Sequence, residues 1–328
     1  MSVCFIRWLV WSDFYRAKIR KKRKNPKKIL PSPLRSIIFV ETKRTVVNKK
    51  LRKYAYYWEL LRTMGQMPKA AQVPVDVLIP VCEKDLRILP LALEGVRRQV
   101  AHPVAAIYII AARSELIEQF CLKHDCRFVD ESEVLGYTAR DLNVKVEPSG
   151  RDRSGWIFQQ LLKLSGRVGE SDYFLTIDSD HILLRPHTFL AEDGRTVFYG
   201  SREYHRPYYE NIERLMGFWP ESRLSYVAHK MCFSRRRLAE LRAELEQRTG
   251  KRWDKAIIES LDRTQISGFS EFELYGNTFP AEQQLQLPWR AHSLTEDKLA
   301  DYETLCRRYR RLYAAVTFPD YRRPKRKK

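Results

Sequence analysis

Four short apolar runs recur through the middle of the chain, and the fold is predicted from their spacing. They are VPVDVLIPV at 73–81, AAIYIIAA at 105–112, CRFV at 126–129 and YFLTI at 173–177. Each run is apolar almost throughout and contains β-branched or aromatic residues. This pattern is typical of strands that are buried on both faces of a sheet.

Helical patterns separate these runs. The helix at 154–166 opens with Ser154 as an N-cap and ends at Gly166. Strands that alternate with helices predict an α/β domain with a mostly parallel sheet, helices on both of its faces and helical extensions at the N- and C-terminal ends. The other expected helices lie at 86–100, 114–124, 208–217, 235–250 and 253–261.

The two ends of the chain differ from this middle in composition. Residues 1–70 combine an aromatic-rich start with a basic block at 16–28 and a second basic, helical stretch at 48–64. Residues 307–328 are again strongly basic. We therefore predict a basic, partly helical N-terminal extension at 1–70, the main domain at 71–306 and a basic C-terminal tail at 307–328.

The net charge of +20 is concentrated on these ends. It is +16 over residues 1–70 and +9 over 307–328, but −5 over 71–306. A nucleic-acid-binding domain should carry its positive charge on the fold itself. Hydrophobic residues beside a polybasic block are instead typical of reversible attachment to an anionic membrane surface, which is the partner that we predict for the ends. A solvated tail, or a helix packed on the body, is the alternative.

Composition also bears on the compartment. The content of 44% hydrophobic residues excludes general disorder, and 30% charged residues excludes a polytopic membrane protein. The longest uncharged apolar run, 100–112, is too short to span a bilayer, and the N-terminal order of apolar then basic residues is the reverse of a secretory signal. We expect a cytoplasmic protein, peripherally associated with the inner face of the cytoplasmic membrane. Free, buried thiols fit that compartment, because no CxxC or zinc spacing occurs among Cys4, Cys82, Cys121, Cys126, Cys232 and Cys306.

The strongest candidate for chemistry is the turn after the fourth run, where YFLTI leads into Asp178, Ser179 and Asp180. In open α/β sheets, ligands bind at the carboxyl ends of the strands. Two carboxylates at i and i+2 can reach one hard cation, and such an ion would stabilise a departing nucleoside diphosphate as a Lewis acid. Because about one such motif is expected by chance in a chain of this length, its position after a buried strand carries the prediction.

Several segments together resemble bacterial glycosyltransferases of the GT-A type, most closely a group associated with surface-polysaccharide synthesis. These segments are VPVDVLIPVCEKD, GWIFQQLLKL, TIDSDH and SEFELYGN, and the resemblance covers about residues 73–295. It implies a GT-A, Rossmann-like sheet in a catalytic domain, a nucleotide-sugar donor, and a Mn or Mg ion bound through the DxD motif.

The resemblance also implies a set of donor-binding side chains. The end of the first strand would line the base and ribose, although Asp85 is equally explained as an N-cap of the next helix. The helix at 154–166 would offer amides to the sugar and an ammonium group to the diphosphate, with Gln159 and Lys163 on one face at i, i+4. The predicted donor-binding residues are Pro80, Val81, Glu83, Lys84, Asp85, Asp130, Gln159, Gln160, Lys163 and Asp178.

The segment SEFELYGN supplies the two catalytic candidates, Glu271 and Glu273. Ser270 and Glu273 fit a helix capping box, which gives Glu273 a structural explanation. Glu271 is then the better candidate for the general base that accepts the acceptor hydroxyl proton. A carboxylate in a first helical turn is a weaker base, so the alternative is that Glu271 only orients the acceptor.

Three histidines compete for a third metal position: His181, His229 and His292. GT-A enzymes often supply a ligand late in the domain, which favours His292, so the predicted metal ligands are Asp178, Asp180 and His292. We place His229 on the acceptor side together with Tyr275, with a buried core histidine as the alternative for His229.

The leading hypothesis is a metal-dependent glycosyltransferase that moves a sugar from a nucleoside-diphosphate-sugar to a saccharide or lipid-linked acceptor, in cell-surface polysaccharide synthesis. One alternative is a nucleic-acid-binding protein that uses its basic termini, but it leaves the strand running into Asp178 without a purpose. The other is a nucleotidyltransferase on a similar fold, which would want a Gly-rich phosphate loop where this chain has VCEKDLR. No nucleic-acid partner is expected.

Overall fold

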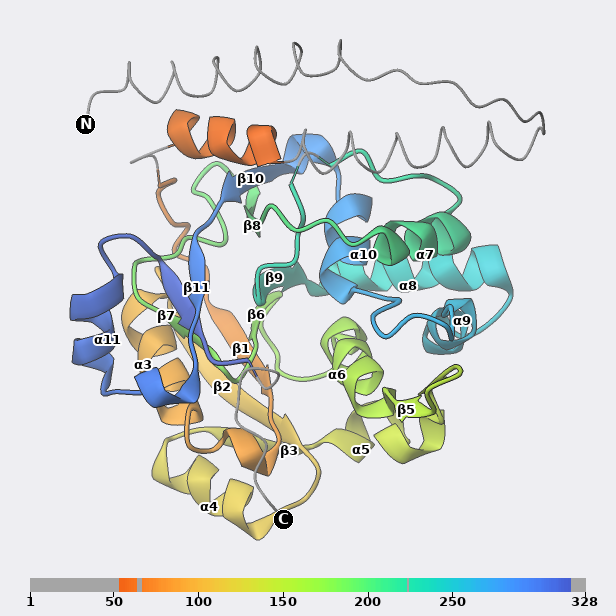
Figure 1. Ribbon diagram of the computed structural model, residues 1–328, viewed down its shortest axis with the longest axis horizontal. Coiled ribbons are helices and arrows are strands. Elements are labelled where there is room, and N and C mark those ends of the chain that lie inside the picture. The colour runs from red at the N-terminus through yellow and green to blue at the C-terminus, as the bar shows by residue number, and fades with distance from the viewer. Residues whose placement is uncertain (1–52, 64–66, 223, 320–328) are drawn as a thin grey trace, which may run out of the picture. The chain divides into compact units, whose positions relative to one another are not determined.

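A five-stranded sheet in the order β3-β2-β1-β6-β9 forms the centre of the computed structural model (Figure 1). The structure describes residues 53–63, 67–222 and 224–319. The predictions for the aromatic start, the basic block at 16–28 and the last nine residues therefore lie outside the described residues. The strands of the central sheet are β1 (Val75–Pro80), β2 (Val104–Ala111), β3 (Arg127–Asp130), β6 (Tyr173–Ile177) and β9 (Lys230–Ser234).

The first four of these strands are the four that the apolar runs predict, and they pair in parallel. The fifth strand, β9, is antiparallel to β6 and was not predicted. Its sequence, KMCFS, is short and begins with a lysine, so its apolar pattern is too weak to indicate a strand.

Residues of the sheet alternate between two apolar cores, as the period of two in a strand requires. Leu78, Ile110 and Phe174 belong to one core, whereas Val77 and Leu175 belong to the other. The first core is covered by α5 (Glu131–Leu135), α6 (Ser154–Ser165), α7 (Arg206–Met216), α8 (Arg235–Thr249), α9 (Trp253–Ser260) and α10 (Glu271–Thr278). The second core is covered by α3 (Leu89–Gln99) and α4 (Glu115–Lys123).

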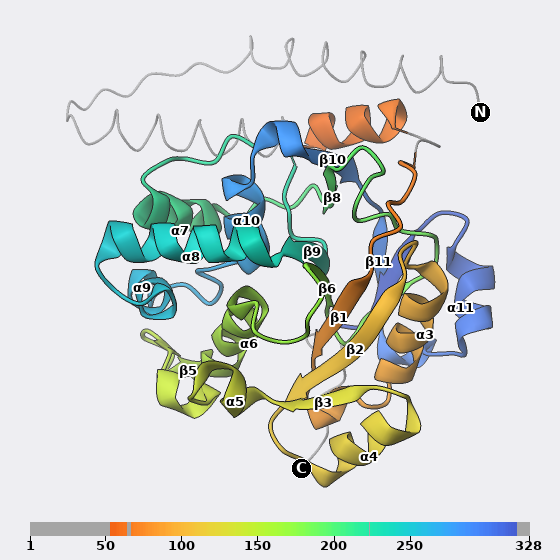
Figure 2. The same cartoon turned by 180° about the vertical axis from the view of Figure 1, so that it is seen from behind.

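Figures 1 and 2 show this division from both sides, with α6 to α10 gathered on one flank of the sheet and α3 on the other. The predicted fold class, an α/β domain with a mostly parallel sheet flanked by helices, is confirmed. The buried thiols of Cys121, Cys232 and Cys306 are free, as predicted, and so is the half-buried thiol of Cys126.

Short strands outside the central sheet complete the fold. Strand β7 (His181–Leu183) follows Asp180 directly and pairs antiparallel with β12 (Ala315–Thr317), which in turn pairs with β11 (Ala291–Ser293). Strand β8 (Thr196–Gly200) pairs in parallel with β10 (Gln284–Pro288). The remaining elements are the hairpin of β4 (Lys145–Val146) and β5 (Arg151–Asp152), and helix α11 (Tyr302–Tyr309).

Both predicted domain boundaries fall inside the folded body. Strand β12 and the buried Phe318 belong to the stretch predicted as a separate basic tail from residue 307. At the other end, residues 53–62 are helical, and Tyr56 is buried with its hydroxyl donating to the carbonyl of Trp289 at 3.0 Å. The packed domain therefore extends beyond 71–306 in both directions. None of the described helices is long and apolar enough to cross a membrane.

A chain that ends at residue 306 should lose about 3–6 kcal/mol of unfolding free energy, because Val316 and Phe318 are fully buried and each side chain contributes about 1.5–3 kcal/mol. A chain that ends at residue 319 keeps β12 and serves as the control. Thermal denaturation followed by circular dichroism measures both. Equal melting temperatures for the two chains would show that β12 adds nothing to the stability of the domain.

Candidate active site

The predicted DxD residues lie where the chain order of the central sheet reverses. The chain runs from β1 outward through β2 to β3, and then returns to place β6 on the other side of β1. Ligands of open α/β sheets bind at the carboxyl ends of the strands next to such a reversal. Asp178, Ser179 and Asp180 follow β6 at this point, and the Ser179 hydroxyl donates to Asp85, in the segment after β1, at 2.9 Å.

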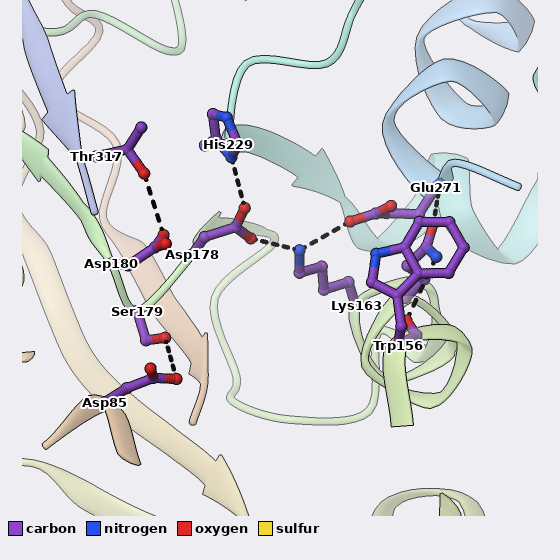
Figure 3. A network of polar contacts seen from close by, with 10 residues as sticks. Asp85, Trp156, Lys163, Asp178, Ser179, Asp180, His229, Glu271 and Thr317 are labelled. Carbon is purple, nitrogen blue, oxygen red and sulfur yellow. Dashed lines mark hydrogen bonds and ion pairs between the residues drawn. The ribbon is translucent and has the colours of Figure 1, made fainter. Parts of the chain in front are cut away.

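Lys163 of α6 connects two carboxylates at the centre of the site (Figure 3). Its Nζ lies 2.7 Å from Asp178 Oδ1 and 2.8 Å from Glu271 Oε1. Lys163 and Glu271 are both buried. Burial by itself disfavours the ammonium, but Asp178 and Glu271 outweigh it and raise the pKa of Lys163. Lys163 therefore remains a cation and compensates the charge of both carboxylates.

His229 holds the other oxygen of Asp178, because its Nδ1 lies 2.9 Å from Asp178 Oδ2. Burial raises the pKa of Asp178, but the charges of Lys163 and His229 outweigh burial and lower it. Burial lowers the pKa of His229, but the Asp178 carboxylate outweighs burial and raises it. Asp178 is thus ionised and neutralised by two neighbours. His229 reaches this position through a left-handed backbone conformation, with φ at 60°.

Asp180 is in a different electrostatic state from Asp178. Its carboxylate accepts a hydrogen bond from Thr317 Oγ1, at 3.3 Å (Figure 3). Burial, followed by the charges of Asp178 and Asp85, raises the pKa of Asp180 to about 6. A carboxylate whose negative charge is disfavoured in this way gains from a bound cation.

The predicted three-ligand metal site is not assembled by the side chains of the structure. Within the described residues, no group of three or more His, Cys, Asp and Glu side chains is placed to hold a metal ion. His292, on β11, stacks on the Tyr313 ring with 4.6 Å between the ring centroids. The electrostatics of Asp180 fit a divalent cation whose remaining ligands are phosphate oxygens and water. The assignment of Asp178, Asp180 and His292 stays a prediction.

The predicted donor-binding residues after β1 lie at the expected edge of the sheet. Pro80 ends β1 and, with Val81, is buried, while Glu83 and Lys84 are exposed in the short helix Glu83–Asp85. Ile88, and not Asp85, occupies the N-cap position of α3, so the capping alternative for Asp85 is wrong.

Asp130, at the end of β3, is the N-cap of α5. Its carboxylate accepts from the backbone and hydroxyl of Ser132, at 3.0 and 2.7 Å, and these bonds lower its pKa. On α6, Gln159 is half-buried and its Nε2 lies 3.7 Å from Cys82 Sγ. The proposed contacts of Asp130 and Gln159 with a donor stay predictions.

Two other predicted site residues, Gln160 and Glu273, are buried and make structural contacts. Gln160 is buried and its side-chain oxygen accepts from the Glu271 backbone at 3.1 Å. The Glu273 carboxylate accepts from Tyr209 at 2.9 Å and from Ser225 at 2.5 Å.

Tyr275, predicted to contact the acceptor, is instead a core residue. It is 1% exposed, and its hydroxyl accepts from the Ser234 backbone at 2.9 Å. Its ring packs against Phe233 and Phe279, so no surface of Tyr275 remains for a ligand.

A cleft of about 570 Å³ opens beside Asp180 and Asp178. Thr317 and His229, which contact these two carboxylates, both line it. The predicted residue His292 lines the same cleft, whereas neither Glu271 nor Glu273 does. Sequence reasoning missed most of its wall, which comes from segments far apart in the chain, including Tyr56, Arg202, Trp289, Arg290 and Tyr313.

Lys230 is a further residue that sequence reasoning missed. It is 1% exposed, and its Nζ lies 3.2 Å from His181 Nε2 and within 5.5 Å of the ring centroids of Tyr199 and Trp289. Burial lowers the pKa of Lys230 to about 7, although Asp178 opposes this. The buried amine thus lies next to Trp289, which lines the cleft. No local signal in KMCFS distinguishes it from a surface lysine.

The sequence matches the model of a family described as a family of unknown function, DUF6492, over residues 84–306. This match covers more than half of the chain. The chain belongs to DUF6492. No curated protein matches its sequence.

The DUF6492 chain is similar to solved structures of glucosyl-3-phosphoglycerate synthase from Mycobacterium tuberculosis, at 16% sequence identity and a TM-score of 0.32. One contains Mn²⁺, uridine diphosphate (UDP) and glucosyl-3-phosphoglycerate, and another contains Mn²⁺, UDP and phosphoglyceric acid. A third contains phosphoglyceric acid. The similarity covers 66% of this chain and 70%, 68% and 70% of the respective synthase chains.

The part of the chain that matches DUF6492 contains Lys163, Asp178, Asp180, His229 and Glu271, and therefore the whole charged centre of the site. Residues before and after the matched segment also line the cleft. Tyr56 precedes the matched segment, and Thr317 follows it.

Proposed function

We propose that this DUF6492 protein is a metal-dependent glycosyltransferase that moves a sugar from a nucleoside-diphosphate-sugar to a saccharide or lipid-linked acceptor. The observation that carries the proposal is the unequal state of the two carboxylates after β6. Asp178 is neutralised by Lys163 and His229, whereas Asp180 is left with a raised pKa beside a cleft. A carboxylate whose charge is not compensated, at the reversal point of an α/β sheet, fits a site for a cation and a diphosphate.

In the proposed reaction, the donor binds on one side of β6 and the acceptor on the other. On the side of β1 and β3, Pro80, Glu83, Lys84 and Asp130 lie where a nucleotide would bind. A divalent cation held by Asp180 would supply Lewis-acid stabilisation of the departing diphosphate. Lys163 fixes the Asp178 carboxylate in place, because the ammonium bonds to Asp178 and Glu271 at once.

The acceptor is assigned to the cleft on the other side of β6, and His229 is the titratable group best placed to meet it. With Nδ1 engaged by Asp178, the Nε2 nitrogen of His229 is the one left for a substrate. His229 can accept the hydroxyl proton of an acceptor at Nε2 when the imidazole is neutral, and the Asp178 carboxylate, which raises its pKa, makes that neutral form a stronger base. Glu271, the base proposed from the sequence, is 4% exposed and bound to Lys163, which fits a residue that positions Lys163.

The proposal is tested by thermal denaturation with nucleoside diphosphates, with and without Mn²⁺. We expect one diphosphate to stabilise the protein only when Mn²⁺ is present, by about 2.7 kcal/mol at one hundred times its dissociation constant. The metal alone and the nucleoside alone are the controls. If no nucleoside diphosphate raises the melting temperature in the presence of Mn²⁺, the transferase proposal fails.

We also propose that the protein acts in cell-surface polysaccharide synthesis at the cytoplasmic membrane, where lipid-linked acceptors are found. The concentration of positive charge in residues 1–70 and 307–328 supports this. Deletion of residues 1–28 should release the protein from vesicles that contain anionic lipid. Vesicles of neutral lipid are the control, and unchanged binding of the shortened chain would contradict the proposed attachment.

A further inference from the structure

The cleft beside Asp180 has an arginine-rich rim, which the proposed transfer reaction does not by itself require. Arg202 and Arg290 both line the cleft, and both are exposed. No carboxylate of the described residues lies within ion-pair distance of either guanidinium. Among the described residues that line the cleft, Glu203 is the single acid, and burial raises the pKa of its carboxyl. The rim therefore presents two guanidinium groups against one carboxyl group.

Two observations place these arginines close together. Arg202 Nη1 donates to the hydroxyl of Tyr57 at 3.1 Å, on the helix that closes one side of the cleft. Tyr56, next to Tyr57 on the same helix, donates its hydroxyl to the carbonyl of Trp289, the residue before Arg290, at 3.0 Å. The two guanidinium groups thus flank the same wall.

Further arginines, which do not line the cleft, lie near Arg290 and the end of α11. The Arg185 guanidinium donates to the carbonyls of Arg310 and Arg311. Burial, and then the positive charges of Arg310 and Arg290, lower the pKa of Arg185. A group of arginines gives a positive local potential, which attracts anions.

Aromatic rings lie beside this charge. Arg290 lies over the Tyr313 ring, with 5.3 Å from its guanidinium carbon to the ring centroid. The His292 ring also stacks on Tyr313, with 4.6 Å between the two ring centroids. Trp289 lines the same cleft. Flat apolar faces next to guanidinium groups suit a ligand that has both a ring and an anionic group.

The position of the rim separates it from the side assigned to the donor. The expected nucleotide site lies at the ends of β1 and β3, whereas the cleft is lined by residues that follow β8 and β10, that precede β9, and that belong to β11 and β12. Thr317 and His229 line the cleft and contact Asp180 and Asp178. A ligand in the cleft can therefore lie beside the reacting centre without occupying the nucleotide position.

We propose that the acceptor of this enzyme carries a phosphate group, and that Arg202 and Arg290 bind it through charge-assisted hydrogen bonds at the rim of the cleft. This inference rests on the proposed glycosyltransferase function, and it adds the chemical class of the acceptor. The phosphate can belong to a soluble sugar phosphate or to a phosphorylated lipid carrier, since both present the same anionic group to the arginines.

The test uses the full chain with Mn²⁺ and UDP at saturating concentration, so that a phosphate probe does not bind at the donor position. Calorimetric titration compares glucose 6-phosphate with glucose, and farnesyl phosphate with farnesol. We expect the two phosphates to bind measurably and the two neutral compounds to bind at least about tenfold more weakly. Displacement of glucose 6-phosphate by farnesyl phosphate at lower concentration would assign the phosphate to a lipid, and the reverse order would assign it to a soluble sugar.

The double variant Arg202→Gln, Arg290→Gln should weaken glucose 6-phosphate binding by at least about tenfold for each arginine. The double variant with Lys at both positions keeps the charge and should retain most of the binding. Arg236→Gln, on the exposed face of α8, is the matched control and should bind as the wild type does. The dissociation constant of UDP with Mn²⁺ should not change in any of these variants.

Equal phosphate affinity in the wild type and the double Gln variant would overturn the inference, as would a wild type that binds UDP with Mn²⁺ but neither phosphate. If instead UDP and the other nucleoside diphosphates do not bind while phosphate binding still depends on the two arginines, the transferase proposal fails and the phosphate site stands. The two proposals can therefore fail separately.

Discussion

Lys163→Met is expected to lower the free energy of unfolding by about 3–5 kcal/mol at pH 7, because it leaves two carboxylates without their shared cation. Lys163 and Glu271 are buried, and Lys163 lies 2.7 Å from Asp178 and 2.8 Å from Glu271. Methionine fills a similar volume, so the loss reflects charge more than packing. Urea denaturation monitored by circular dichroism measures the change.

The pH dependence of this loss distinguishes an electrostatic cause from a packing defect. In the wild type, the lowered pKa of Asp178 contributes stability that is present above the unfolded pKa and lost as the pH falls through the folded one. In the variant, the uncompensated carboxylates bind protons more readily in the folded state than in the unfolded state, so its stability should increase as the pH falls from 7 to 5. The difference between variant and wild type should therefore shrink at pH 5.

Lys251→Met is the matched control for Lys163→Met. Lys251 pairs with Glu259 on the surface, where both side chains are about half exposed. Loss of such a pair should cost less than about 1 kcal/mol. If Lys163→Met were no more destabilising than this control, or if its loss were independent of pH, Lys163 would not be the compensating cation of the site.

Asp180→Asn should weaken Mn²⁺ binding in the presence of a nucleoside diphosphate by at least about 100-fold, because it removes the carboxylate proposed to hold the cation. It should not destabilise the metal-free protein at pH 7 to 8. In the wild type the raised pKa of Asp180 means that stability falls as the pH rises from about 4 to about 6, and Asn removes that loss. Melting temperatures with and without metal separate the two effects.

The raised pKa of Asp180 also leads to a prediction of how metal binding depends on pH. Burial and the charges of Asp178 and Asp85 raise the pKa of Asp180 to about 6, and a metal must displace the proton below that pH. The apparent affinity for Mn²⁺ should therefore fall by about tenfold for each pH unit below 6. Asp297→Asn, at an exposed surface position, is the control. A metal affinity that Asp180→Asn leaves unchanged would remove Asp180 from the metal site.

The sequence predicted the strands that local pattern can reveal and missed those that it cannot. The runs at 73–81, 105–112, 126–129 and 173–177 became β1, β2, β3 and β6, since each is a continuous apolar stretch. Strands β7, β11 and β12 have three residues each, and a period of two cannot be recognised over so short a length. The tail predicted from residue 307 was therefore placed outside the domain, although it contributes β12.

Within the candidate site, the sequence indicated where charge would be placed but not how it would be compensated. It placed Asp178 and Asp180 after a buried strand, and it assigned Lys163 to the donor and His229 to the acceptor. It treated the two aspartates as equivalent metal ligands, because they are two residues apart in one motif. In the structure, Lys163 and His229 neutralise Asp178, and Asp180 keeps a raised pKa. It also placed Tyr275 near the acceptor, whereas the ring is part of the core.

By itself, the sequence determined the α/β class of this protein and the position of Asp178 and Asp180 at the end of a strand, because both follow from patterns between near neighbours in the chain. Only the tertiary structure decided which carboxylate is left for a cation, and which residues form the cleft beside it. Charge compensation and burial depend on distance in space, and Tyr56, Arg202, Trp289 and Thr317 come together only when the chain has folded.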